Sequence, residues 1–452
     1  MDFFSTKNQN LKVSFKEALF TGMPIDNGLY MPSNLPDLSN FFADNSLSFE
    51  EISYEISSRF IDNELSNSDI LDIAHSAISF KAPNQHIYKN IYCLELFHGP
   101  TLAFKDIAMQ VIGNLYGHLK TAKDKPLNIL VATSGDTGSA AIAALNNREN
   151  INLFVLHPHN KISSVQRKIM TTIGGSNIYN IAIEGSFDDC QKIVKELFND
   201  DSFRLKINMS GVNSINWARI VCQIVYYFYA YFKLKKENIS FSVPTGNFGD
   251  IYAGYIAKKM GLSINKLIVA TNENDILKRV INTGEYKPDQ VRTSFSPSMD
   301  IQVASNFERL LFNIVGEDDK RVSLLMQDLS SKGFFKLSKE EQETLKKDFC
   351  AEKINNKDTL SLINETNSKL SFILDPHTAT ALGAAKKVND LSNTVILGTA
   401  HPYKFLETIK IAIGKEVEKP TQLSKIEDKK EKFVVIENSN LEIKNYILSK
   451  IQ

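Results

Sequence analysis

Lys105 is the side chain of this sequence best placed for covalent chemistry, because it lies in an apolar run just after the break at Gly99-Pro100. Thr101 is expected to cap a helix that holds Lys105 in its first turns. Since burial among apolar neighbours disfavours an ammonium, we expect the pKa of Lys105 to lie below its ordinary value. Its free amine would then be available for imine chemistry. The alternative is a surface lysine whose charge pairs with Asp106.

Two glycine-containing loops have the chemistry to hold anions. The run Pro244-Thr-Gly-Asn-Phe-Gly-Asp250 follows a predicted strand and opens a predicted helix at 251–260, where backbone N–H groups can hold a phosphate. The run Ala132-Thr-Ser-Gly-Asp-Thr-Gly-Ser139 follows a strand at 127–132 and suits an anion such as a carboxylate. For each loop the alternative is an ordinary turn without a ligand.

Arg219 is a third candidate for anion binding. It stands in the segment Ser214-Ile-Asn-Trp-Ala-Arg219, which opens an apolar helix with Ser214 as the expected N-cap. A guanidinium suits a phosphate because its planar fork donates two parallel hydrogen bonds. Lys161 is a weaker candidate for the same anion. Without a ligand, Arg219 would be merely the last charge before a core helix.

Strands, glycine loops and helices alternate from Leu127 onward, and this alternation predicts a parallel α/β sheet. Helical patterns in the first part of the chain indicate a mostly helical N-terminal domain at residues 1–92. Residues 93–412 are predicted to form the catalytic domain, with a charged helical insertion near 300–370. Residues 413–452 are predicted as a C-terminal extension.

Composition narrows the class of protein. The chain has 452 residues, 43% of them apolar, which is enough for two or three domains. Lysine plus arginine and aspartate plus glutamate number 52 each, which argues against a nucleic-acid binder or a protein held on anionic lipid. Four scattered cysteines argue against a zinc site or disulfide framework, so we predict no metal.

Two segments bear on location. The apolar run 220–232 is too short to span a membrane and predicts a buried core helix. Residues 1–10 lack the basic and apolar regions of a secretory signal. We therefore expect a cytoplasmic protein.

The run His98-Gly-Pro-Thr-Leu-Ala-Phe-Lys-Asp106 resembles the pyridoxal-phosphate lysine motif of the threonine synthase family. Later segments resemble that family in the same order along nearly the whole chain. The resemblance implies the α/β fold of the tryptophan-synthase-β-like enzymes (fold type II), with parallel sheets in two lobes and pyridoxal 5'-phosphate between them. It also implies that Lys105 is the catalytic residue and holds the cofactor covalently.

The resemblance also assigns roles to other positions. It implies cofactor contacts from Gly246, Asn247, Phe248, Gly249 and Asp250 at the phosphate and from Thr399 at the pyridine nitrogen. It gives the substrate's carboxylate to Ser134, Gly135, Asp136 and Thr137, and the substrate's phosphate to Ser214, Asn216 and Arg219. Asp136 stands where many relatives outside this family carry asparagine, which favours threonine synthases over cysteine synthases and dehydratases.

The activity implied by the resemblance converts O-phospho-L-homoserine and water to L-threonine and phosphate, the last step of threonine biosynthesis. One alternative is a related phospho-lyase that releases a 2-keto acid, which product analysis would separate. Another is a catalytically silent relative that binds a small molecule; the intact Lys105 argues against it. The expected partner is a small-molecule substrate, with no nucleic acid and no membrane, and we expect a monomer or homodimer.

Overall fold

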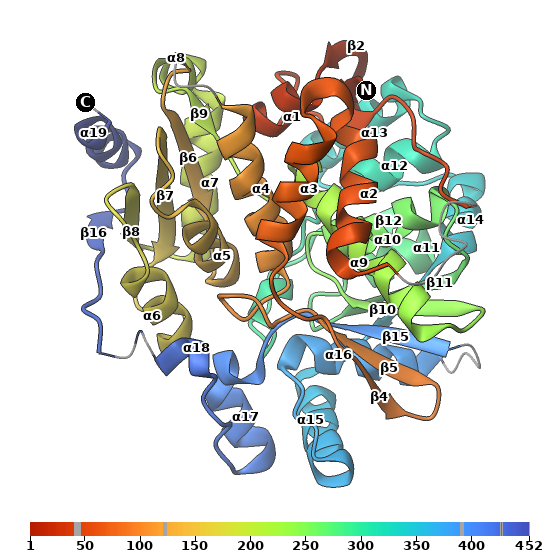
Figure 1. Ribbon diagram of the computed structural model, residues 1–452. Coiled ribbons are helices and arrows are strands. Elements are labelled where there is room, and N and C mark those ends of the chain that lie inside the picture. Colours follow the sequence, from red (N-terminus) through yellow and green to blue (C-terminus); the bar gives the residue numbers. More distant parts are fainter. Residues whose placement is uncertain (40–46, 121–123, 389–392, 425, 427, 452) are drawn as a thin grey trace.

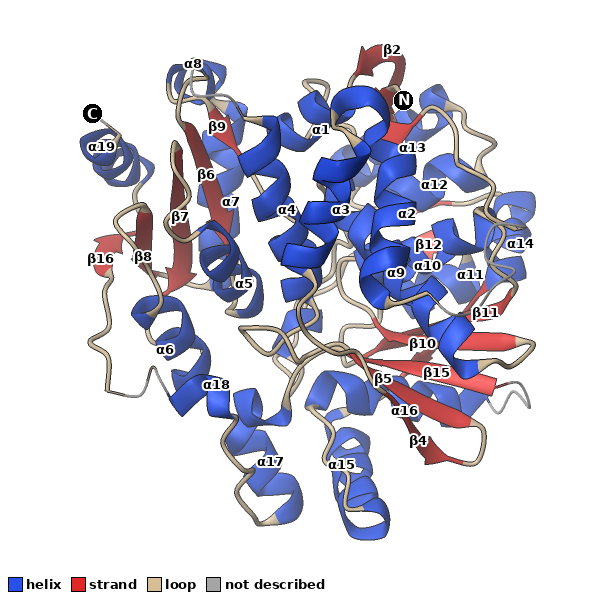
Figure 2. Ribbon diagram, viewed as in Figure 1, coloured by secondary structure: helices blue, strands red, loops and turns tan. Residues whose placement is uncertain are grey.

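Two mainly parallel β-sheets form the framework of this computed structural model (Figures 1 and 2). The structure describes residues 1–39, 47–120, 124–388, 393–424, 426 and 428–451. The larger sheet contains β4 (Asn84–Tyr88), β5 (Ile91–Glu95), β10 (Ile239–Pro244), β11 (Ile264–Thr271), β14 (Phe349–Lys353) and β15 (Asn393–Gly398). Its strand order is β14-β11-β10-β15-β5-β4. All of its pairings are parallel except that of β4 with β5. Every residue of β10 is buried, as expected for a parallel strand covered on both faces.

The smaller sheet is parallel throughout. Its strands are β6 (Leu127–Ala132), β7 (Ile151–Pro158), β8 (Ile178–Glu184), β9 (Met209–Ser210) and β16 (Val434–Glu437). They lie in the order β16-β8-β7-β6-β9. Its helices are α5 (Asp136–Leu145), α6 (Ser164–Thr172), α7 (Phe187–Asn199), α8 (Asp201–Lys206) and α19 (Asn440–Lys450). The predicted parallel α/β architecture is confirmed, and each sheet defines one lobe.

The apolar run 220–232 lies in α9 (Trp217–Leu234), which is buried along most of its length. It packs against α2 (Phe49–Ile61), α4 (Lys105–Leu119) and α10 (Gly249–Lys259). A helix that is apolar on nearly all sides must be enclosed by protein or lipid, and here it is enclosed by other helices. Among the described residues no helix is long and apolar enough to cross a membrane.

Serine–acid pairs determine where several helices begin. In α2, α7, α3 (Asn67–Ala77) and α14 (Lys339–Asp348), the N-cap serine accepts an N–H three residues later, and an acidic residue there returns a bond. This capping box satisfies helix N–H groups that lack acceptors within the helix. These starts are therefore encoded locally.

The N-terminal region is less helical than predicted. β1 (Phe3–Ser5) pairs antiparallel with β2 (Asn8–Val13) and β3 (Tyr30–Pro32), and α1 (Phe15–Thr21) lies between β2 and β3 in the chain. β4 and β5 belong to the larger sheet. Residues 1–92 therefore combine a small sheet, helices and the first strands of the catalytic framework.

The segment 300–370 is more than a helical insertion. Its helices are α12 (Phe307–Ile314), α13 (Asp319–Lys332), α14 and α15 (Asn356–Leu370). Between α14 and α15, however, β14 pairs in parallel with β11 and forms one edge of the larger sheet. A short pair, β12 (Glu285–Tyr286) with β13 (Phe335–Lys336), ties α13 to the preceding region. α11 (Ile276–Thr283) and α16 (Pro376–Val388) complete this lobe.

The C-terminal residues also belong to the framework. After α17 (Leu406–Ile413) and α18 (Thr421–Ser424), the chain returns to the smaller lobe, where β16 pairs with β8. Figure 1 shows β16 and α19 at the outer side of this lobe, far along the chain from their neighbours. Ile443 and Ile447 of α19 are fully buried there.

Candidate active site

A cleft of about 1110 Å³ is lined by residues from both lobes. Its walls include the loops that follow β5, β10 and β15 in the larger sheet and the loop that follows β6 in the smaller one. In open α/β sheets, ligands bind at the carboxyl ends of the strands. Five side chains far apart in the sequence line this cleft together: Lys105, Asp136, Arg219, Asp250 and Thr399.

Lys105 is the first residue of α4, and its Nζ atom lies 4.7 Å from the ring centroid of Phe104. Nζ also lies 3.5 Å from Asp136 Oδ2. The pKa of Lys105 is lowered, mainly by burial, although the Asp136 carboxylate opposes this shift. Two further cations, Arg219 and Lys404, add to the lowering. The predicted alternative of a surface lysine is therefore wrong.

The start of α4 differs from the prediction, because the helix begins at Lys105 and Thr101 is not its cap. Thr101 instead donates its hydroxyl and its N–H to Asp106, at 2.6 and 2.9 Å. Asp106 is thereby held by Thr101, and the carboxylate nearest Lys105 is that of Asp136. A Cβ atom on Gly99 would lie 2.5 Å from Asp106 Cβ, so the turn needs glycine there.

Asp136, the first residue of α5, is shared by two lysines. Its Oδ1 atom lies 2.5 Å from Lys404 Nζ, and its Oδ2 atom faces Lys105. Gln166 donates a third contact, from Nε2 to Oδ1 at 2.9 Å. Burial alone would raise the pKa of Asp136, but Lys404 and Lys105 together hold it well below its ordinary value. The carboxylate is therefore ionised and fully engaged by protein groups.

The loop after β10 is a tight connection into α10. Phe248 has φ 66°, in the left-handed region, and its ring packs edge-on against Phe307 in the core. A Cβ atom on Gly246 would lie 2.7 Å from the carbonyl oxygen of Ser298, so this position too requires glycine. The Asn247 carbonyl accepts the Asn306 N–H at 3.0 Å. The first N–H groups of α10 lack acceptors within the helix, as an anion site requires.

Asp250 anchors this loop to α9. Its Oδ1 atom accepts hydroxyl hydrogen bonds from Tyr226 at 2.6 Å and Tyr227 at 3.1 Å, while its Oδ2 atom is buried without a partner. Burial raises the pKa of Asp250 to about 6, although the two hydroxyls oppose this shift. The side chain of Asp250 therefore faces protein groups, which leaves the backbone of the loop as its anion-binding part.

Arg219 is a buried cation that lines the cleft without a carboxylate partner. Its side chain is 2% exposed, and its one hydrogen bond among the described residues goes to the Val212 carbonyl at 3.3 Å. Its Nε atom has no hydrogen-bond partner in the part of the chain that the structure describes. Burial lowers the pKa of Arg219 to about 10, so the guanidinium stays charged at neutral pH. A buried positive charge of this kind favours an anionic ligand.

Thr399 follows β15 and lines the cleft, where its carbonyl accepts the Phe104 N–H at 2.9 Å. Its own N–H donates to the hydroxyl of Thr378 at 3.2 Å. The Asp375 carboxylate accepts from that hydroxyl and lies 2.9 Å from His377 Nδ1. The backbone around Thr399 is thus fixed both to the start of α4 and to this buried polar group.

The predicted substrate residues fall into two groups. Ser134, Asp136, Thr137, Ser214 and Arg219 line the cleft, and Gly135 lies between two of them with φ 137°. Asn216 does not line it, because its side chain caps α9 through Ala218 N–H and bonds the Leu19 carbonyl at 2.8 Å. Asn216 therefore replaces Ser214 as the N-cap. Lys161 is exposed and does not line the cleft, so its expected placement is also corrected.

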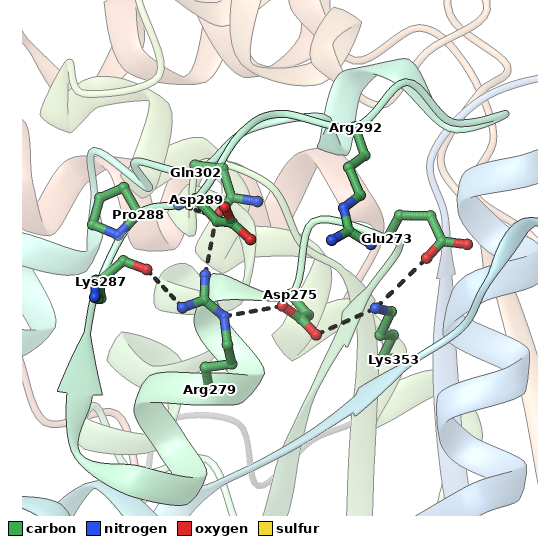
Figure 3. Close-up of a pocket in the computed structure, with 9 residues that line it drawn as sticks. All are labelled: Glu273, Asp275, Arg279, Lys287, Pro288, Asp289, Arg292, Gln302 and Lys353. Atoms are coloured by element: carbon green, nitrogen blue, oxygen red, sulfur yellow. Dashed lines mark hydrogen bonds and ion pairs between the residues drawn. The ribbon is translucent and has the colours of Figure 1, made fainter.

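A second, polar cavity has a volume of about 430 Å³, and Figure 3 shows the residues that line it. Its cations are largely paired within the protein: Lys353 contacts Glu273 and Asp275, and Arg279 contacts Asp275 and Gln302. Gln302 lines both spaces. This cavity holds an ion-pair network and lacks the reactive amine, so we assign the chemistry to the larger cleft. Among the described residues no three acidic, histidine or cysteine side chains could hold a metal together.

Sequence reasoning missed several groups that hold the site. Lys404 carried a signal, since it is a lysine between two aromatic residues, five positions after Thr399. Gln166 and the pair Asp375–His377 carried none, because only the fold brings them to the site. His401, in contrast, caps the turn at Tyr403 as a structural residue.

The cleft fits pyridoxal 5'-phosphate. A buried amine with a lowered pKa suits its aldehyde, and the N-terminus of α10, which no described side chain caps, suits its phosphate. The Thr399 side chain supplies a neutral hydroxyl in the same cleft. Of the charged groups around Lys105, Asp136 is already engaged by protein, whereas Arg219 has an unpaired Nε atom among the described residues and can receive an anionic ligand.

Comparisons with known proteins agree with this geometry. Family models match residues 2–78 (threonine synthase N terminus), 78–399 (pyridoxal-phosphate dependent enzyme) and 378–447 (threonine synthase, C-terminal). The threonine synthase of Pseudomonas aeruginosa is 42% identical over 99% of this chain and 98% of its own. That of Saccharomyces cerevisiae is 39% identical over 98% and 96%. A crystal structure of PLP-bound threonine synthase from Brucella melitensis covers 100% of both chains with a TM-score of 0.95 at 40% identity.

Proposed function

The chain belongs to the threonine synthase family of pyridoxal-phosphate-dependent enzymes, and we propose that its cleft carries out that family's reaction with Lys105 as the catalytic residue. The enzyme is a lyase that converts O-phospho-L-homoserine and water to L-threonine and phosphate. Pyridoxal phosphate, when bound, supplies the electron sink for this chemistry. Lys105 holds the cofactor and, once its amine is free, moves protons at the substrate's Cα and Cβ.

We assign the cofactor's phosphate to the loop Gly246–Asp250, through its backbone, and its pyridine nitrogen to Thr399. The loop before α10, which requires glycine at position 246, and the position of Thr399 in the same cleft support this assignment. A neutral hydroxyl beside the nitrogen leaves it less protonated than a carboxylate would. The side chains of Phe248 and Asp250 contribute by holding the loop, since both are engaged inside the protein.

The observation that carries the substrate assignment is the buried guanidinium of Arg219, which has no carboxylate partner among the described residues and lines the same cleft as Lys105. Arg219 would hold the substrate's phosphate and stabilise it as a leaving dianion, with Ser214 as a further donor. The substrate's carboxylate would lie at Ser134–Thr137, at the start of α5. The Asp136 carboxylate is occupied by two lysines, so that residue would contribute its backbone N–H.

We infer that the small-molecule substrate is the principal partner, that no nucleic acid or membrane takes part, and that the chain acts as a monomer or homodimer. The equal numbers of acidic and basic residues support a small-molecule partner over a nucleic acid or a membrane. Cys93, Cys190 and Cys222 are buried free thiols, which suits a reducing cytoplasm.

The decisive experiment incubates the purified full-length protein and pyridoxal phosphate with O-phospho-L-homoserine and measures threonine, phosphate and 2-keto acid together. We expect threonine and phosphate in equal amounts. Phosphate with a 2-keto acid in place of threonine would identify the phospho-lyase alternative. The absence of all three products would leave only a binding protein.

A further inference from the structure

Lys404 is a lysine with no exposed side-chain surface, and the assigned chemistry leaves it without a role. It lies in the 3-10 turn η3 (Pro402–Phe405), five residues after Thr399, which itself follows β15. Its Nζ atom lies 2.5 Å from Asp136 Oδ1 and donates to the Thr101 carbonyl at 2.9 Å. A buried lysine is retained only where its charge is matched, and here the matching carboxylate is the one that faces Lys105.

Lys404 closes a ring of contacts at the base of the cleft. Its carbonyl accepts the Ser163 hydroxyl at 3.3 Å, and that hydroxyl also donates to Gln166 Oε1 at 3.0 Å. Gln166 in turn donates to Asp136. Thr101 follows β5 of the larger sheet and Asp136 follows β6 of the smaller one. Lys404 therefore joins the two lobes at the point where Lys105 reaches between them.

We propose that Lys404 is a positioning residue of this site: by holding the shared carboxylate of Asp136, it fixes the place of the Lys105 amine and favours its uncharged form. With Lys404 present, Asp136 keeps a cation when Lys105 loses its proton or becomes bonded to a ligand. Without Lys404, Lys105 would be the remaining cation on a buried carboxylate and would be held as an ammonium. An ammonium has no lone pair with which to attack a carbonyl.

The charges around Lys105 shift its pKa in the direction that this role requires. The charged groups facing Lys105 are Asp136 of α5, Lys404 of η3, Arg219 of α9 and Asp250 of α10. Asp136 raises the pKa of Lys105, whereas Lys404 and Arg219 lower it. Removing Lys404 takes away one cation and leaves the Asp136 carboxylate to interact with Lys105 alone. Both changes raise the pKa of Lys105.

The test measures the Lys105 amine directly. Full-length cofactor-free protein is labelled with trace acetic anhydride over a range of pH, and acetylation of Lys105 is quantified by peptide mass spectrometry. Lys404→Met, which is nearly isosteric and uncharged, is expected to move the labelling midpoint of Lys105 upward by about one pH unit, a tenfold smaller free-amine fraction below the midpoint. Lys444→Met is the matched control, because Lys444 pairs with Asp200 at the same 2.5 Å but outside the cleft. It should leave the midpoint unchanged.

Two more variants separate positioning from simple structural support. Asp136→Asn should lower the Lys105 midpoint, and the double variant Asp136→Asn/Lys404→Met should fall below Lys404→Met alone. A lower thermal stability with an unmoved midpoint in Lys404→Met would overturn the proposal. If Lys404→Met fails to fold, the Asp136→Asn arm decides: no downward shift there would also overturn it.

A second readout follows covalent attachment of pyridoxal phosphate by its visible absorption. In Lys404→Met, attachment at neutral pH should be about tenfold weaker and should recover about one pH unit higher. The inference rests on the proposed role of Lys105, but the labelling uses neither substrate nor cofactor. Failure to form threonine would therefore defeat the proposed function, whereas an unmoved labelling midpoint would defeat this inference alone.

Discussion

At the scale of single residues, the cleft contains charged side chains that are buried but only partly hydrogen-bonded. Arg219 Nε and Asp250 Oδ2 are buried without partners among the residues that the structure describes, and both residues line the space around Lys105. Folded proteins pair nearly all buried polar atoms, so each exception calls for an explanation. A bound anion beside Arg219 would satisfy that guanidinium. The unpaired Arg219 Nε atom therefore indicates where in the cleft an anionic ligand fits.

Lys105→Ala should abolish both the visible absorption of covalently held pyridoxal phosphate and turnover of O-phospho-L-homoserine. The fold should survive, because Asp136 retains Lys404 as its cation. Lys195→Ala is the control, since Lys195 also lines the cleft but is exposed on α7. It should keep the absorption and the activity. Parent-like turnover in Lys105→Ala would mean that another residue is the catalyst.

Arg219→Met should lower kcat/KM for O-phospho-L-homoserine by about 30-fold to several thousand-fold, equivalent to about 2–5 kcal/mol for a desolvated charge pair. Cofactor binding should remain, because the cofactor's phosphate is assigned to another loop. The melting temperature should stay level or rise, since an uncompensated buried charge is removed. Loss of cofactor absorption together with activity would instead place Arg219 at the cofactor, and unchanged kcat/KM would remove it from the phosphate pocket.

At the scale of elements, the Thr101–Asp106 contact fixes where α4 begins and hence where Lys105 lies. Burial raises the pKa of Asp106 to about 6, and the hydrogen bonds from Thr101 favour its charged form. When the pKa of a carboxyl is higher in the folded than in the unfolded protein, the free energy of unfolding falls as pH rises from the unfolded pKa to the folded pKa. Above pH 6 the Asp106 carboxylate is charged and is stabilised by the hydrogen bonds from Thr101. Below pH 6 Asp106 is protonated, so these hydrogen bonds contribute less.

Thr101→Val should accordingly destabilise the protein by about 2 kcal/mol at pH 8, the usual value of a hydrogen bond to a charged group, and by less at pH 5. Chemical unfolding at both pH values measures this difference. Thr359→Val is the control, because the Thr359 hydroxyl donates at 3.0 Å to the neutral Asn355 carbonyl. Its loss should not vary with pH. An equal deficit of Thr101→Val at both pH values would contradict the ionised state of Asp106.

Elements with a strong local pattern were predictable, and those defined by distant partners were not. The predicted strands at 127–132 and directly before Pro244 are rich in branched or aromatic apolar residues and are followed by glycine loops, and they match β6 and β10 closely. β14 was missed because Phe349–Lys353 is short and lies among charged helices; its partner β11 is far away in the sequence. β16 was missed because it is also short and half of its residues face solvent.

The site shows the same division. Lys105, Gly246–Asp250 and Thr399 stand in short motifs, so the sequence indicated them as a group. The cap of α9 was misplaced because Ser214 and Asn216 are both good N-caps, and only the fold shows that Asn216 reaches the Leu19 carbonyl. The Lys404–Asp136 pair depends on two strands from different sheets ending beside each other, which no local pattern encodes.

At the scale of the whole molecule, both ends of the chain return to hold the lobes. The N-terminal amine lies 2.7 Å from Asp62, and Lys7, near the start of the chain, lines the cleft. At the other end, Arg167 of α6 pairs with Glu431 at 2.9 Å before β16 and α19 close the smaller sheet. The smaller lobe, which carries Asp136, is thus completed by the last residues of the chain.

This arrangement predicts that stability and chemistry can be separated at α19. Ile443 is fully buried against the smaller sheet, and no residue of α19 lines the cleft. Ile443→Ala should therefore destabilise the protein by about 2–5 kcal/mol, through lost burial and the cavity left behind. The kcat/KM at 25 °C should stay near the parent value while the protein remains folded. Leu441→Ala, on the same helix but 66% exposed, should change stability by no more than about 0.5 kcal/mol. Thermal unfolding and steady-state kinetics on the same samples measure both quantities. A fall in kcat/KM of Ile443→Ala at a temperature where it is fully folded would show that α19 positions the Asp136 side of the cleft as well as closing the lobe.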